Sequence, residues 1–157
     1  MHGRDLIETG GGPYRRDHRG ARASGNKNLR ELWRRLVFGI LIRNTDDHLR
    51  NHGFLRADTA GWSLSPAFDV NPDPEPGPVR LATSVDGRTD EAGLDVALKV
   101  AELFRLVDRD ARAIVRAVAA ATAAWRTVAV GVSLPDREIE RMARAFEHDQ
   151  LAYAQTV

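Results

Sequence analysis

The 157-residue sequence contains no cysteine, which excludes disulfide bonds, thiolate zinc sites and cysteine nucleophiles together. It also has no uninterrupted apolar run of about 18 residues, the length that a membrane-spanning helix needs. The first twelve residues, MHGRDLIETGGG, lack the basic, apolar and small-residue order of a signal peptide. These absences argue against a transmembrane or secreted protein, and we expect a cytoplasmic one.

What is present is an ordinary globular composition with an uneven charge. Hydrophobic residues make up 43% of the chain and charged residues 29%, so the length fits one domain or one lobe of a larger protein. Residues 1–30 carry a net charge of +4, whereas the remainder carries −3. The basic, Gly-rich residues 1–27 are either a poorly ordered, solvated leader or a phosphate-binding arm. We do not expect direct nucleic-acid binding.

Hydrophobic spacing and turn residues predict an α+β fold that is mostly α, with its main domain over residues 28–157. Apolar residues at 3- and 4-residue spacing indicate the first helix, and Asp108, Gly131 and a capping box at 133–136 mark later helix ends. The predicted elements are a helix at 28–42, strands at 53–56 and 62–65 joined by a hairpin loop at 58–61, an extended proline-rich connector at 71–78, a strand at 81–85, and helices at 94–106, 108–130 and 133–154.

The densest polar cluster, Asn44 to His52, lies between the first helix and the hairpin. Asp46 and Asn51 reproduce the D-x-x-x-x-N spacing of a kinase catalytic loop, in which the Asp takes the proton of the attacking hydroxyl and the Asn binds a metal ion. Asp69 follows Asn51 by 18 residues, after the hairpin, where such a kinase places its second metal ligand. Taken alone, Asp46 also fits a structural role as a turn or helix-end residue.

The intervening residues resemble a known family. The sequence NTDDHLRN at 44–51, LSPAFD at 64–69 and LATSVDG at 81–87 closely resemble the C-terminal domain of the HipA family, serine/threonine protein kinase toxins of type II toxin–antitoxin systems. The resemblance runs from about Leu29 to the C-terminus. It implies the helical C-terminal lobe of a protein-kinase-like fold, with the small hairpin beside the catalytic loop.

The resemblance also implies roles for individual residues. Asp46 would be the catalytic base, and Asn51 and Asp69 would bind Mg²⁺ and ATP. His48 would contact the transferring phosphoryl group. The implied partners are a HipB-like DNA-binding antitoxin and a protein substrate such as an aminoacyl-tRNA synthetase.

Three other polar residues of the cluster are expected to have no role of their own. We interpret Asp47 as a tolerated loop residue, and Arg50 and His52 as solvated side chains.

A kinase also needs a nucleotide-covering loop and a lysine that pairs with the phosphates. The sequence has only two lysines, Lys27 in a predicted turn and Lys99 in a predicted helix, and neither suits that role. We therefore expect the N-terminal lobe to be missing and the chain to be nearly inactive alone. A separate chain that supplies this lobe is one partner that the resemblance implies.

Two alternatives stay open. One is a non-catalytic remnant or interaction module that binds an antitoxin-like partner. The other is a metal-dependent nuclease or phosphohydrolase built on Asp46, Asp47, His48 and His52.

Aromatic and histidine residues outside the cluster are expected to be structural. Trp33 and Phe38 are predicted core residues, and His148 is predicted to lie on a solvated helix face. The remaining aromatic residues that we expect to pack rather than bind a ligand are Trp62, Trp125, Phe146 and Tyr153.

Overall fold

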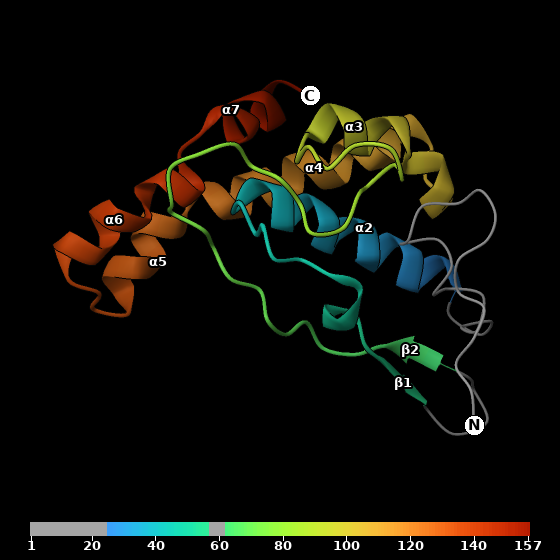
Figure 1. Ribbon diagram of the computed structural model, residues 1–157, viewed down its shortest axis with the longest axis horizontal. Coiled ribbons are helices and arrows are strands. Elements are labelled where there is room, and N and C mark those ends of the chain that lie inside the picture. The colour runs from blue at the N-terminus through green and yellow to red at the C-terminus, as the bar shows by residue number, and fades with distance from the viewer. Residues whose placement is uncertain (1–24, 57–61) are drawn as a thin grey trace.

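The computed structural model describes residues 25–56 and 62–157, and it is mostly helical with one small antiparallel sheet (Figure 1). The central helix α2 has the hairpin on one side and helices α3, α4 and α7 on the other. The elements are α2 (Gly25–Leu41), the 3-10 turn η2 (Leu49–Asn51), β1 (Phe54–Arg56), β2 (Trp62–Leu64), α3 (Leu94–Lys99), the 3-10 turn η4 (Ala101–Phe104), α4 (Asp108–Ala123), α5 (Trp125–Gly131), α6 (Asp136–Phe146) and α7 (Asp149–Thr156). The expected α+β class is confirmed at this level.

The apolar stripe of α2 forms the centre of the core. Trp33 is completely buried and its ring lies 5.3 Å from that of Phe104, centroid to centroid. The prediction that Trp33 is a core residue is therefore confirmed. Phe38 was wrongly placed in the core, because it is 37% exposed on the flank of the stripe.

Helix α2 ends in a Schellman motif whose left-handed position is occupied by an arginine and not by the usual glycine. The amide of Arg43 donates to the carbonyl of Ile40 and the amide of Asn44 to that of Gly39, while Arg43 takes a left-handed φ of 56°. The buried Arg43 side chain then donates from Nη2 to the carbonyl oxygens of Glu75 and Gly77, at 2.8 and 3.2 Å. The end of α2 thus fixes the proline-rich connector against the helix.

The hairpin is confirmed. Strands β1 and β2 pair antiparallel with Phe54 opposite Leu64 and Arg56 opposite Trp62. The loop predicted at 58–61 lies outside the described residues, as does most of the leader predicted at 1–27. Helix α2 begins at Gly25, so Lys27 lies in its first turn rather than in the predicted turn.

The connector at 71–78 contains neither helix nor strand, as its alternating prolines predict. The strand predicted at 81–85 is wrong. Among the described residues this segment forms only an isolated antiparallel bridge, Arg80 with Glu91, beside which the amide of Leu81 donates to Asp90, and the amide of Ala82 donates to Thr45. Its alternating apolar residues, Leu81 and Val85, are buried in the core all the same.

Each of the three predicted C-terminal helices is broken. The first divides into α3 and η4, the second into α4 and α5 at Ala124, and the third into α6 and α7. The predicted caps also differ: Val107 and Pro135 are the N-cap residues of α4 and α6, with no side-chain cap hydrogen bond. Helix α5 ends at Gly131 as predicted, but the left-handed residue that follows the helix is Ser133, with φ 60°, and not the glycine.

The stretch Asp108–Gly131, which contains α4 and α5, is long and apolar enough to cross a membrane by length and composition alone. In this fold 33% of its most apolar window is buried. A core helix of a soluble protein passes the same test. In this fold the inward face of α4, with Ala111, Val115 and Ala119, is part of the hydrophobic core against α2 and α7.

The C-terminal aromatic residues behave mostly as packing residues. Trp125 and Phe146 stack with ring centroids 4.7 Å apart, which confirms their predicted role. Trp62 and Tyr153 are exposed by 44% and 40%.

His148 was wrongly placed on a solvated face. It lies half-buried at the break between α6 and α7, and its Nε2 hydrogen-bonds the carbonyl of Leu41 at 3.0 Å. This contact ties the C-terminal helices to the end of α2. Burial, with the positive charge of Arg43 as a smaller cause, holds the pKa of His148 below its ordinary value.

The lowered pKa predicts a pH-dependent stability. Between the folded pKa and the unfolded value of 6.5, the unfolded chain binds more protons, so protonation favours unfolding. The free energy of unfolding should therefore fall as the pH drops from about 7.5 to about 5.5. Urea unfolding across this range measures it, and His148→Gln, which can still donate to Leu41, should flatten the slope. An unchanged slope in that variant would assign the dependence to other groups.

Candidate functional site

The polar loop begins where the Schellman motif ends and is compact. The amide of Asn51 donates to the carbonyl of His48 at 2.8 Å, and that of His52 to Leu49 at 3.2 Å, which forms η2. Thr45 Oγ1 donates to the carboxylate of Asp73 at 3.0 Å. The loop is therefore fixed by helix α2 on one side and the connector on the other.

Asn51 and Asp69, predicted as metal ligands, line one cavity of about 470 Å³. Asn51 is buried, and its Nδ2 donates to the backbone carbonyl of Asp46 at 3.3 Å. Asp69 is exposed, has a left-handed φ of 56° and accepts a hydrogen bond from Asn71 at 2.9 Å. The fold thus brings together two residues separated by the whole hairpin.

Asp46 and His48, predicted as catalytic residues, belong to the same loop but do not line this cavity. The side chain of Asp46 is exposed, and only its backbone carbonyl contacts Asn51. His48 is partly buried, and its Nδ1 finds no hydrogen-bond partner within residues 25–56 and 62–157. The structure therefore places the carboxylate predicted as the base outside the cavity that Asn51 and Asp69 line.

Sequence reasoning missed the pair formed by Asp47 and His52. Both side chains are buried and line the cavity, with His52 Nε2 3.0 Å from Asp47 Oδ1. The prediction that His52 is solvated is wrong, whereas Arg50 is exposed as expected. Gly39 gave no signal for this pair, because a Cβ there would lie 3.9 Å from Asp47 Oδ2, an ordinary van der Waals contact.

The donor chemistry of the cavity suits Mg²⁺, which prefers oxygen ligands. Asn51 keeps its Oδ1 and Asp69 its Oδ2 outside the hydrogen bonds given above, so each can offer an oxygen. Among the residues described, no three His, Asp or Glu side chains form a group that could hold a metal. The nuclease alternative built on Asp46, Asp47, His48 and His52 therefore gains no structural support.

Gly53 lets the two halves of the site approach each other. A Cβ at this position would lie 3.0 Å from Ser65 Oγ and 3.4 Å from Phe68 Cε1. Ser65 and Phe68 stand just before Asp69, so the segment that carries Asp69 packs directly on the end of the loop that carries Asn51.

A family model described as the HipA-like C-terminal domain matches residues 14–125, more than two thirds of the sequence. The chain belongs to this HipA-like family. The match contains the loop, the hairpin and Asp69, and it ends at Trp125, so α6 and α7 of this HipA-like chain lie outside it. It begins earlier and ends sooner than the resemblance estimated from residue 29 to the C-terminus. No curated protein and no solved structure matches the chain.

The close approach at Gly53 predicts a cost for any side chain there. Gly53→Ala should lower the free energy of unfolding by about 1–3 kcal/mol, because the new methyl group overpacks Ser65 and Phe68. Urea unfolding measures this loss. The matched control is Gly131→Ala, where nothing lies within 4 Å of the new Cβ and the helix should gain up to about 1 kcal/mol. Equal stability of the two variants would show that the segment before Asp69 moves aside freely.

Proposed function

We propose that this chain supplies the catalytic-loop part of a HipA-like serine/threonine protein kinase, in a helical C-terminal lobe of kinase-like fold. The observation that carries the proposal is the shared cavity of Asn51 and Asp69, which the kinase spacing predicts as the two metal ligands. The family relation supports it. The proposed reaction is phosphoryl transfer from ATP to a serine or threonine hydroxyl of a protein, in the cytoplasm.

In this proposal each residue has a separate task. Asn51 and Asp69 hold Mg²⁺, which would neutralise charge on the ATP phosphates. The exposed carboxylate of Asp46 orients the substrate hydroxyl and takes its proton, from a position open to a large protein substrate. His48 would contact the transferring phosphoryl group, and because its Nδ1 is buried in this structure, that contact would need the loop to shift when the nucleotide binds.

The phosphate-clamping groups come from elsewhere in this proposal. Lys27 lies in the first turn of α2. Lys99 pairs with Asp95 at 3.1 Å on the exposed face of α3. Neither lysine lines the cavity. An N-terminal lobe, in the same or a separate chain, would supply the lysine and the nucleotide-covering loop. Losing one preorganised donor costs about 10²–10³-fold in rate, so this chain alone should be nearly inactive.

The metal-ligand assignment predicts Mg²⁺-dependent ATP binding that needs Asp69. Asp69→Asn should weaken binding at least about tenfold, because it removes the only carboxylate of the proposed ligand pair. Titration calorimetry of the full chain with millimolar ATP, with and without Mg²⁺, measures it. The control is Asp90→Asn, which makes the same charge change on the surface, where Asp90 pairs with Arg80. No Mg²⁺-dependent binding by the folded chain would contradict the proposal.

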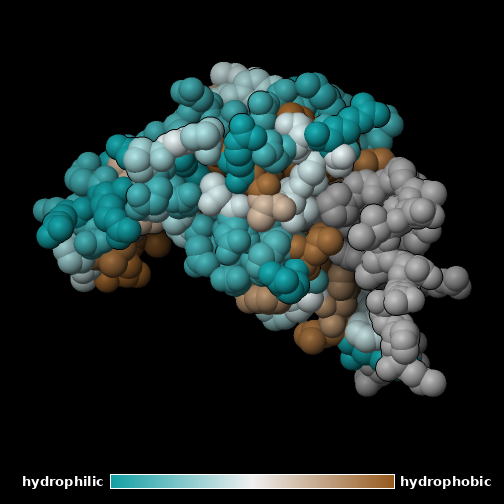
Figure 2. Space-filling view, viewed as in Figure 1, coloured by the Kyte–Doolittle hydropathy of each residue, from teal (hydrophilic) through white to brown (hydrophobic). Residues whose placement is uncertain are grey.

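A second candidate, a non-catalytic binding module, is favoured by an apolar cavity of about 770 Å³. It is lined by Phe38 of α2, Val118 of α4, Val132 after α5 and Met142 of α6. Figure 2 shows apolar residues gathered at the end of the molecule where α5 and α6 join. Arg126 ties α5 to α6 through Glu140 at 2.6 Å. In this candidate the cavity receives an apolar face of a HipB-like antitoxin.

The second candidate predicts that a charge in the cavity prevents complex formation. Val132→Asp should abolish co-purification with a co-expressed HipB-like helix-turn-helix protein, because it places a carboxylate against an apolar partner. Val107→Asp is the control, since Val107 is similarly exposed (63% against 66%) but lies outside the cavity. Equal retention of the partner by both variants would exclude the cavity as the binding surface.

A further inference from the structure

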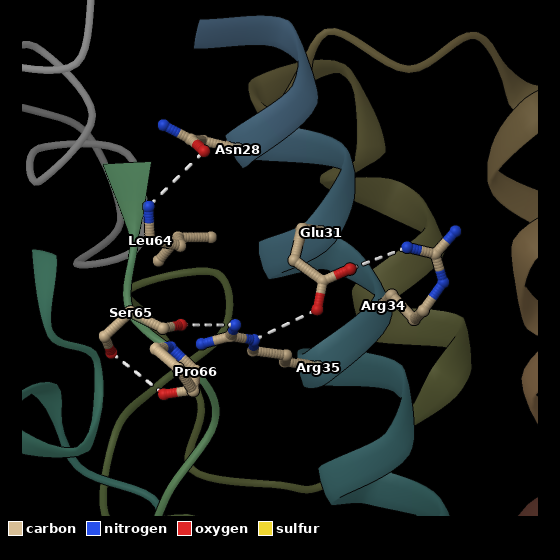
Figure 3. Close-up of polar contacts among 7 residues, drawn as sticks. All are labelled: Asn28, Glu31, Arg34, Arg35, Leu64, Ser65 and Pro66. Atoms are coloured by element: carbon tan, nitrogen blue, oxygen red, sulfur yellow. Dashed lines mark hydrogen bonds and ion pairs between the residues drawn. The ribbon is translucent and has the colours of Figure 1, made fainter. Parts of the chain in front are cut away.

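Helix α2 contacts both halves of the proposed metal site. The polar loop with Asn51 continues directly from its C-terminus, and the side chain of Arg35 reaches the segment that leads to Asp69 (Figure 3). Arg35 Nη2 donates to the backbone carbonyl of Ser65 at 2.7 Å, and its Nε donates to Glu31 Oε1 at 3.2 Å. The guanidinium group therefore links a fixed carboxylate on the helix to the end of β2.

Ser65 is the point where the chain leaves the hairpin. It is buried, and its amide donates to the carbonyl of Gly53 at 2.9 Å. Asp69 follows four residues later, and Arg35, Ala67 and Asp69 all line the cavity that contains Asn51. A movement of Ser65 along α2 would thus carry Asp69 with it.

A second contact keeps β2 aligned along the helix. Asn28 Nδ2 donates to the carbonyl of Trp62 at 3.3 Å, and Asn28 Oδ1 accepts from the amide of Leu64 at 3.4 Å (Figure 3 shows the latter). Asn28 and Arg35 lie two turns apart on the same helix. Asn28 bonds the first and last residues of β2, and Arg35 bonds Ser65 just after it. These contacts therefore hold the strand at one position along α2.

We propose that Arg35 is a positioning residue that fixes Asp69 relative to Asn51. The proposal rests on the metal-binding role proposed for these two residues. A charged donor makes a stronger hydrogen bond than a neutral one, and the guanidinium fork serves Glu31 and Ser65 at once, which a lysine cannot do with the same geometry. Arg35 is also largely enclosed, with a side chain 15% exposed.

Arg34 provides a matched control on the same helix. Its Nη1 pairs with the other carboxylate oxygen of Glu31 at 2.7 Å (Figure 3), but its side chain is 47% exposed and has no hydrogen bond to β1, β2 or Ser65 among the described residues. Arg35→Met and Arg34→Met therefore each remove one guanidinium from Glu31. Only the first removes the hydrogen bond to Ser65.

The test uses Mn²⁺ as a probe of the metal site in the full chain. Arg35→Met should weaken Mn²⁺ binding about 10–100-fold, the usual effect of removing a group that orients a ligand. Arg34→Met should stay within about twofold of the unchanged chain, and Arg35→Lys should fall between the two. In an Asp69→Asn background, Arg35→Met should add less than about twofold, because the ligand that it positions is already lost.

The double variant separates positioning from general stabilisation. If Arg35→Met weakens Mn²⁺ binding by the same factor with and without Asp69, Arg35 does not act through Asp69 and the proposal is overturned. The same result follows if Arg34→Met and Arg35→Met have equal effects.

A metal-free measurement keeps the proposal testable if the unchanged chain binds no Mn²⁺, a result that would remove the metal site itself. Backbone amide NMR of Arg35→Met should then show faster hydrogen exchange at Ser65 and shifts concentrated in residues 65–71, with residues 44–51 unchanged. Unchanged amides at 65–71 would overturn the positioning role independently of the proposed function.

Discussion

Burial of the apolar face of α2 is the constraint on which the rest of the structure depends. Trp33, Leu36, Val37 and Ile40 are almost fully removed from solvent, and each large apolar side chain contributes about 1.5–3 kcal/mol when buried. This burial fixes the rotation of the helix about its axis. The edge of this face, with Asn28 and Arg35, then faces the hairpin, and the polar loop continues from the C-terminus of the helix.

The sequence was sufficient to predict the parts of the fold that depend on local patterns. The stripe of α2, the paired strands and the irregular proline-rich connector follow from apolar spacing, β-prone residues and missing amide donors. The break at His148 could not be read from the sequence, because a distant contact accompanies it. His148 leaves the helix to bond the carbonyl of Leu41, more than 100 positions earlier.

For the candidate site too, the sequence predicted some features and not others. Motif spacing predicted that Asp46, Asn51 and Asp69 share one pocket. Asn51 and Asp69 line one cavity, because a hairpin returns the chain to its starting point, whereas Asp46 does not line it. Spacing could not show that Asp47 and His52 turn inward while Asp46 stays exposed. In a short loop the direction of each side chain depends on the tertiary contacts available to it, here the pairing of Asp47 with His52, and not on residue type alone.

The left-handed residues at the helix ends have a consequence for how this fold can tolerate change. Arg43, Arg105 and Ser133 each take a conformation in which glycine would be relaxed, at a cost of about 1 kcal/mol or more. Arg43 and Arg105 use their side chains to hold distant segments, the connector and Asn26 respectively. Glycine at either position would relieve the backbone and release a neighbouring part of the molecule, so local relaxation and long-range cohesion oppose each other there. Within the described chain the Ser133 side chain makes no such long-range hydrogen bond. Replacing Ser133 with glycine would therefore relieve the backbone without releasing another segment.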